Sequence, residues 1–285
     1  MMNVTPLDAT FGATVTDLVL TDLDDGLFQT LYDTWLRYSL LIFPEQHLDN
    51  EKQVAFTQRF GPLEPKLELY EFSNIAANGS VRTGPNDDMI KILKGNMDWH
   101  QDSTYMEVQA KGAVFRAEVV PETGGETGWA DMAAAYDALD CSMRHHVETL
   151  SAQHSLVHSQ KKVGFGLKDE DSEYMGYGMD QLSAPLRPLV KTHSETGRKS
   201  LTIGRHAYGV QGMTDAESET FLTELVDFAC QPPRVHHHEW AAGDIVIWDN
   251  RCLLHRACPW DMTEPRIMFH SRLSGHPKHE FAALV

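Results

Sequence analysis

The stretch GDIVIWDNRCLLH, residues 243–255, places a short apolar run close to a histidine. Residues 244–248 combine β-branched and aromatic side chains and predict a buried strand. Gly243 before the run and Asn250 after it are typical of strand ends. His255 follows a second apolar pair, Leu253 and Leu254, and a single histidine in such a setting is more often a core residue than a ligand.

Similar signals occur along the rest of the chain. Further strands are predicted at residues 40–43, 113–120, 200–203 and 266–273. Helices are predicted at residues 27–36, from about residue 50 to Gly61, at 133–139 with Asp131 as cap, and after the capping box that joins Thr214 to Glu217. Strands dominate the last quarter and helices gather elsewhere, which favours an α+β fold over repeated βαβ units. Without a linker or a repeat, we expect one domain, residues 1–285.

Composition restricts the possible functions. The chain has 24 Lys and Arg against 41 Asp and Glu, a net charge of −17, which argues against a nucleic-acid partner. No window approaches the ~18 apolar residues of a membrane span, and the N-terminus does not resemble a secretory signal. Four cysteines without a C-x-x-C pair indicate a reducing compartment, so we expect a cytoplasmic protein without a membrane partner. We expect residues 165–183 to form a long loop over a site.

The 15 histidines are the unusual feature of the composition. On a strand or turn, residues i and i+2 project to the same side, so His-x-Asp or His-x-Glu can chelate a metal. Composition alone predicts about two such tripeptides, and five occur. They pair His47 with Asp49, His100 with Asp102, His146 with Glu148, His193 with Glu195, and His237 with Glu239.

Context separates these five pairs. Asp49 is better explained as a helix cap, and His146 lies within a predicted helix that would turn Glu148 to another face. The composition around His193 predicts an exposed turn, and residues 236–238 read as surface or packing residues at a strand edge. His100 follows Trp99 and an irregular approach, which suits a position facing a cavity. From the residues alone, His100 can be either a metal ligand or a buried histidine held by hydrogen bonds.

A site with two histidines and one carboxylate needs a distant third ligand, for which His255 is the candidate. Residues 251–272 contain four arginines and two acidic residues, a local charge of +2 in an acidic chain. Such a stretch suggests a site for an anionic small molecule. A chain that turns back over residues 258–265 can bring Arg266 beside the metal, where its guanidinium fork suits a carboxylate. Thr127, after a Gly-Gly turn, adds a hydroxyl.

Four blocks in this order and spacing resemble the taurine / 2,4-D dioxygenase family of Fe(II)- and 2-oxoglutarate-dependent oxygenases. The blocks are WHQD at 99–102, VVPETGGET at 119–127, GDIVIWDNRCLLHR at 243–256, and Arg266. The likeness covers essentially the whole chain. It is closest to aryloxyalkanoate dioxygenases of the (S)-2-phenoxypropionate type, through GNM at 95–97, RPLVK at 187–191, IGRHA at 203–207 and HSRL at 270–273.

The resemblance implies a double-stranded β-helix, or jelly roll, decorated with helices. It implies that His100, Asp102 and His255 bind Fe(II), and that Arg266 and Thr127 hold the distal carboxylate of 2-oxoglutarate, with Trp240 lining that pocket. The cosubstrates are then 2-oxoglutarate and O2. The implied reaction hydroxylates the ether-bearing carbon of an aryloxyalkanoate, which yields a phenol and a 2-oxo acid.

One position departs from the family pattern. His270 stands where relatives carry a second arginine for the substrate anion, and Arg272, at the same strand parity, is a possible substitute. We expect the pocket for a small anionic organic substrate to include Asn96, Tyr105, Arg205, His206, His270 and Arg272. For each of these except Arg272, an ordinary packing or surface role is the alternative. We also expect a homo-oligomer. The alternatives are a taurine, alkyl sulfonate or sulfate dioxygenase with the same machinery and, from other classes, a non-catalytic jelly-roll module or a zinc hydrolase.

Overall fold

The strand predicted near residue 246 is β13 (Ile245–Asp249), the central strand of a seven-stranded sheet. The computed structural model describes residues 2–82, 84, 87–162, 164 and 184–282, so the expected loop at 165–183 lies outside the described residues. The sheet has the order β1 (Asn3–Pro6), β2 (Ala13–Thr16), β3 (Leu40–Phe43), β13, β5 (Gly112–Val119), β15 (Ile267–Leu273) and β4 (Tyr70–Ser73). Its neighbouring strands are antiparallel except β2 and β3.

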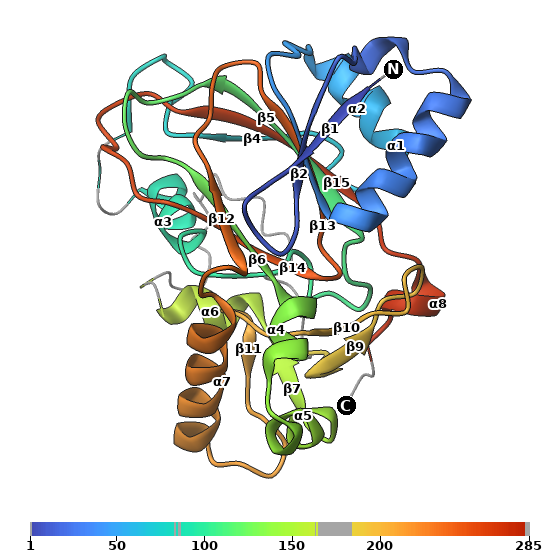
Figure 1. The fold of residues 1–285 in the computed structure, drawn as a ribbon. Helices are drawn as coiled ribbons and strands as arrows, with labels where there is room; N and C mark the ends of the chain where they lie inside the picture. The colour runs from blue at the N-terminus through green and yellow to red at the C-terminus, as the bar shows by residue number, and fades with distance from the viewer. Residues whose placement is uncertain (1, 83, 85–86, 163, 165–183, 283–285) are drawn as a thin grey trace.

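Three smaller sheets and the helices complete the described fold (Figure 1). The smaller sheets are β12 (Val235–His238), β6 (Thr127–Asp131) and β14 (Leu253–Ala257); β11 (Ala207–Tyr208), β7 (Ser151–His154) and β8 (Leu186–Pro188); and β9 (Val190–Thr192) with β10 (Lys199–Leu201). The helices are the 3-10 turn η1 (Leu20–Asp22) and α1 (Asp25–Tyr38), α2 (Asn50–Gln58), α3 (Asp88–Gly95), α4 (Met132–Ala138), α5 (Cys141–Glu148), α6 (Leu156–Lys162), α7 (Asp215–Ala229) and α8 (Pro277–Glu280). The structure confirms a mixed fold of helices and sheets.

Strand β13 is buried on both faces, which explains its unbroken apolar run. Ile245 and Ile247 belong to the core that the large sheet shares with α1 and α2, which includes Trp35. Trp248 points to the opposite face, where its ring centroid lies 5.9 Å from that of Trp129 on β6. The large sheet is therefore covered by helices on one face and by the sheet β12-β6-β14 on the other (Figure 1).

Most predicted elements near the N-terminus and around α7 are confirmed. The helix at 27–36 is α1, the strand at 40–43 is β3, and the capping box begins α7. Asp131 caps α4 by accepting from the backbone N–H groups of Ala133 and Ala134. The helix from residue 50 ends at Gln58 rather than Gly61, because the N–H groups of residues 59–61 turn to carbonyls three residues back.

Strand β6 gave no recognisable signal in the sequence. All five of its residues are buried, so it lacks the alternation of polar and apolar residues that marks a half-exposed strand. Its Gly128 also lowers strand propensity. The glycine is required here because a Cβ would lie 2.9 Å from the ring of His237 and 3.0 Å from that of Trp99.

Candidate active site

His100 and His255 face each other across an antiparallel backbone pair. The His100 N–H donates to the His255 carbonyl at 2.9 Å, and the His255 N–H donates to the His100 carbonyl at 2.8 Å. Residues opposed in this way project to the same side, and the two ring centroids lie 4.2 Å apart. Gly204 packs against the same segment with φ +115°, and a Cβ there would lie 2.8 Å from the Trp99 carbonyl oxygen.

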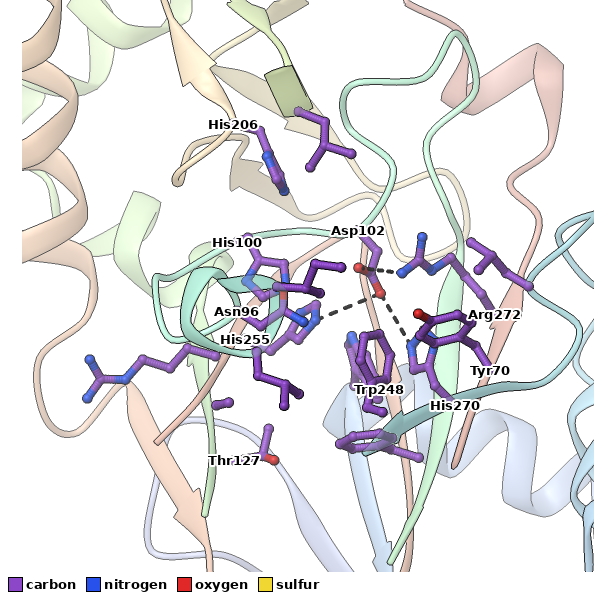
Figure 2. Close-up of a pocket in the computed structure, with 18 of the residues that line it drawn as sticks. Tyr70, Asn96, His100, Asp102, Thr127, His206, Trp248, His255, His270 and Arg272 are labelled. Atoms are coloured by element: carbon purple, nitrogen blue, oxygen red, sulfur yellow. Dashed lines mark hydrogen bonds and ion pairs between the residues drawn. The ribbon is translucent and has the colours of Figure 1, made fainter. Parts of the chain in front are cut away.

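The Asp102 side chain reaches the same space (Figure 2). Its Oδ1 accepts a hydrogen bond from Arg272 Nη2 at 2.8 Å. Its Oδ2 is buried and lies 3.4 Å from His270 Nε2 and 3.8 Å from His255 Nε2. The ligand atoms of His100, Asp102 and His255 all lie within 4.8 Å of one another.

Burial sets the protonation of these groups. Desolvation lowers the pKa of His100 to about 4 and that of His255 well below its ordinary value, so both rings are neutral near pH 7. His100 Nδ1 lies 2.8 Å from the Asp98 carbonyl, which can only accept, so Nδ1 carries the hydrogen and Nε2 offers a lone pair. Burial would raise the pKa of Asp102, but the positive charge of Arg272 holds it well below its usual range.

This donor set fits a divalent metal ion. Two neutral imidazoles and one carboxylate are the ligands of the facial triad that binds non-haem Fe(II) with open positions. The carboxylate oxygen Asp102 Oδ2 is buried, and a bound cation would compensate its charge. A hydrogen bond from the second ring nitrogen to a backbone carbonyl, as His100 makes, orients a metal-binding imidazole.

Arg266 supplies a second feature of the pocket. Its side chain is 3% exposed, and Nη2 donates to the Gly125 carbonyl at 3.1 Å. No carboxylate of the described residues pairs with it, and burial lowers the pKa of its guanidinium to about 10. A buried guanidinium without a counterion is a site for an anion. Thr127 lines the same pocket, and its Oγ1 accepts from Trp240 Nε1 at 2.9 Å.

The rest of the lining divides into a polar and an apolar part. The apolar lining residues are Leu67, Phe72, Ile92, Leu93, Phe115, Leu156, Trp248 and Ala257, and the ring of Tyr70 adjoins them. The polar residues include Asn96, Tyr105, Gln160, His206, His270 and Arg272. In Figure 2, Thr127 and His206 lie on opposite sides of the pair His100 and His255. The apolar lining residues give no signal in the sequence that separates them from the core, because apolar residues of strands and helices usually belong to the core.

Two of the expected site residues do not line the pocket. Trp240 lies behind Thr127 and contacts it through the hydrogen bond already described. Arg205 hydrogen-bonds Gln160 Oε1 at 3.0 Å and also contacts the Gly95 carbonyl, so it joins α6 to α3 beside the pocket. The next residue, His206, lines the pocket, and its Nδ1 lies 2.8 Å from the Ser159 hydroxyl.

One expectation about a single residue needs correction. His193 is not on an exposed turn: it is 4% exposed, and its Nε2 lies 2.9 Å from Asp249 Oδ2. Of the four arginines in the cationic stretch 251–272, Arg256, Arg266 and Arg272 line the pocket. Arg251 does not line it and instead donates to both carboxylate oxygens of Asp249. Of the described histidines, 236–238 do form the edge strand β12, as expected.

Comparisons with known proteins agree with this geometry. The family model described as "Taurine catabolism dioxygenase TauD, TfdA family" matches residues 3–271. The chain belongs to this family. Two of its relatives, from Sphingobium herbicidovorans and Delftia acidovorans, are named (S)-phenoxypropionate/alpha-ketoglutarate-dioxygenase. They are 61% and 57% identical over 98% and 100% of this chain and 97% and 99% of their own lengths.

A solved structure gives the same result for the fold. The crystal structure of AAD-2 in complex with Mn(II) and N-oxalylglycine superposes with a TM-score of 0.87 at 33% identity, over 96% of this chain and 97% of that chain. The family predicted from the four sequence blocks is thus confirmed. Among the described helices, none has both the length and the apolar character needed to cross a membrane.

A buried histidine outside the site makes stability depend on pH. His154 on β7 is fully buried, neither ring nitrogen has a hydrogen-bond partner among the described residues, and burial lowers its pKa to about 3. The unfolded chain binds this proton near pH 6.5, so the free energy of unfolding falls as the pH drops below that value.

We predict that, between pH 7 and pH 5, the free energy of unfolding of the wild type falls by about 2 kcal/mol more than that of His154→Leu. Urea denaturation of the wild type and the variant at both pH values measures this difference. The same pH dependence in both proteins would show that His154 is protonated in the folded state.

Proposed function

We propose that the protein is an Fe(II)- and 2-oxoglutarate-dependent dioxygenase that hydroxylates the ether-bearing carbon of an aryloxyalkanoate. The hydroxylated carbon then carries two oxygens and collapses to a phenol and a 2-oxo acid. One O2 and one 2-oxoglutarate are consumed for each substrate, and one succinate and one CO2 are released. The names of the two relatives at 61% and 57% identity support the substrate class.

The observation that carries the proposal is the juxtaposition of two complementary sites in one pocket. His100, Asp102 and His255 present a carboxylate and two neutral imidazoles, a set that suits Fe(II). The same pocket contains Arg266, a buried guanidinium without a carboxylate partner in the described structure. A dicarboxylic keto acid can bind the metal through its keto-acid end and pair with Arg266 through its distal carboxylate.

Each of these residues has a part in the reaction. Bound Fe(II) supplies the redox chemistry that couples loss of CO2 from 2-oxoglutarate to reduction of O2. Arg266 and Thr127 hold the distal carboxylate, and the hydrogen bond from Trp240 orients the Thr127 hydroxyl. The low exposure of the pocket residues excludes water, which strengthens the pairing of Arg266 with the keto acid.

The substrate would lie across the polar and apolar parts of the lining. Side chains such as Phe72, Ile92 and Leu93 form a surface suited to an aromatic ring. Asn96, Tyr105, His206 and His270 would contact the ether and carboxylate end, and Arg205 holds Gln160, another residue of the lining. This apolar surface favours an aryloxyalkanoate over taurine, whose short ethylene bridge is its only apolar part.

We further infer that residues 1–285 form a single catalytic domain with a double-stranded β-helix core. Support comes from the packing of Trp129 against Trp248 between two mainly antiparallel sheets and from the family match over residues 3–271.

A substrate screen tests the proposed function. The purified protein, with Fe(II), ascorbate and 2-oxoglutarate, is given each enantiomer of 2-phenoxypropionate, phenoxyacetate, taurine and an alkyl sulfate, and succinate and phenol are measured. We expect equal amounts of succinate and phenol with at least one aryloxyalkanoate. Succinate formation that responds only to taurine or the alkyl sulfate would overturn the substrate assignment, and no O2-dependent succinate with any substrate would overturn the enzyme class.

Removal of either imidazole should abolish the reaction. We predict that His100→Ala and His255→Ala each lose iron-dependent turnover, because two ligands hold Fe(II) too weakly and in the wrong geometry. His145→Ala, which changes an exposed histidine on α5, is the matched control and should keep the wild-type rate. Near-normal turnover by either site variant contradicts the ligand assignment.

Loss of the guanidinium should act mainly on the cosubstrate. We predict that Arg266→Ala raises the apparent KM for 2-oxoglutarate by about 100-fold or more, as expected for a buried charged hydrogen bond worth about 3 kcal/mol. Initial rates over a range of 2-oxoglutarate concentrations measure it, with the aryloxyalkanoate KM as internal control. An unchanged KM for 2-oxoglutarate would mean that another residue binds its carboxylate.

A further inference from the structure

Arg272 lines the pocket, but its guanidinium is directed at a metal-ligand candidate. Nη2 donates to Asp102 Oδ1 at 2.8 Å, and Nη1 donates to the Ser103 hydroxyl at 3.1 Å. Its Nε lies 3.8 Å from Glu64 Oε2. All four residues are less than a tenth exposed. Figure 2 shows Arg272 beside Asp102, on the side of the carboxylate away from His100.

Glu64 and Ser103 fix the position of this guanidinium. The Ser103 hydroxyl lies 2.9 Å from Glu64 Oε1 and 3.1 Å from Oε2, and it can donate to Glu64 while it accepts from Arg272. The charge of Arg272 is thus shared between two buried carboxylates. A group held in this way by three neighbours is not available to follow a mobile substrate anion.

The backbone of Asp102 is held independently by Asn250. The Asp102 N–H donates to Asn250 Oδ1 at 2.8 Å, and Asn250 Nδ2 donates to the Asp102 carbonyl at 2.9 Å and to the Ala110 carbonyl at 3.0 Å. Ser103 has φ 55°, in the left-handed region that a residue with a side chain rarely adopts. The Asp102 N–H and carbonyl are therefore both held by one side chain, that of Asn250 in the turn after β13.

We propose that Arg272 is a positioning residue that holds Oδ1 of Asp102, so that Oδ2 faces the metal between His100 and His255. The inference rests on the proposed function, because it takes Asp102 as a metal ligand. Oδ2 is the carboxylate oxygen that the guanidinium does not hold, and it lies 3.8 Å from His255 Nε2 and 3.4 Å from His270 Nε2. Because Arg272 binds Oδ1, only Oδ2 is left to bind the metal, and Asp102 acts as a ligand through one oxygen.

Metal binding without turnover tests the proposal. Mn(II) is titrated into wild-type protein, Arg272→Gln and Arg272→Lys, with detection by calorimetry and by the electron paramagnetic resonance signal of free Mn(II). We expect Arg272→Gln to raise the Mn(II) Kd about 10- to 100-fold, as is typical when a partner of a metal ligand is lost. Arg272→Lys, which keeps the charge but not the fork, should recover part of the affinity.

A matched control separates positioning from general destabilisation. Arg116 is a buried arginine on the neighbouring strand β5, directed towards Gln53 of α2 and away from the pocket. Arg116→Gln should leave the Mn(II) Kd unchanged. If Arg272→Gln does not fold, as judged by thermal melting, the comparison of Arg272→Lys with the wild type decides the question.

The kinetic constants distinguish the alternative role. At saturating Fe(II), a positioning residue leaves the KM for the aryloxyalkanoate unchanged. An unchanged Mn(II) Kd together with a raised substrate KM in Arg272→Gln or Arg272→Lys would overturn the proposal. It would show that Arg272 binds the substrate anion. Failure of the wild type itself to bind Mn(II) would instead overturn the proposed function.

Discussion

The backbone pair between His100 and His255 is the constraint on which the site depends. Its two hydrogen bonds bring an irregular segment and strand β14 together, so that two imidazoles from opposite halves of the chain share one cavity. Strand β14 is in turn paired along its whole length with β6, and Trp129 of β6 packs against Trp248 on the central strand of the large sheet. The geometry of the site thus follows from the packing of one sheet on another.

The pocket contains two buried groups of opposite charge, the carboxylate of Asp102 and the guanidinium of Arg266, and only the first has an ion-pair partner among the described residues. The charge of the Asp102 carboxylate is partly compensated by Arg272, which binds Oδ1 and leaves the buried Oδ2 facing His255 and His270. The guanidinium of Arg266 has no carboxylate partner among the described residues. Burying either group without compensation is costly, and a metal ion with a bound keto acid would compensate both. The pocket is therefore organised for two ligands that neutralise it together.

The sequence predicted those parts of the site that depend on the spacing of residues close together along the chain. The i, i+2 relation of His100 and Asp102, and the order of four blocks, were sufficient for the family. What failed depended on distant partners: His193 is buried because Asp249 lies 56 residues away in sequence but beside it in space. Likewise, strand parity placed Arg272 at the pocket, whereas its pairing with Asp102, 170 residues away, needed the fold. The fully buried strand β6 carried no periodic signal at all.

The proposed metal and 2-oxoglutarate sites are tested most directly by a crystal structure with Mn(II) and N-oxalylglycine, an analogue of 2-oxoglutarate, with the metal located by its anomalous scattering. We expect one Mn(II) ion bound by the Nε2 atoms of His100 and His255 and by Oδ2 of Asp102. We also expect the distal carboxylate of the analogue to pair with Arg266 and Thr127. A metal bound at other residues, or an analogue whose carboxylate does not reach Arg266, would show that the site has been misassigned.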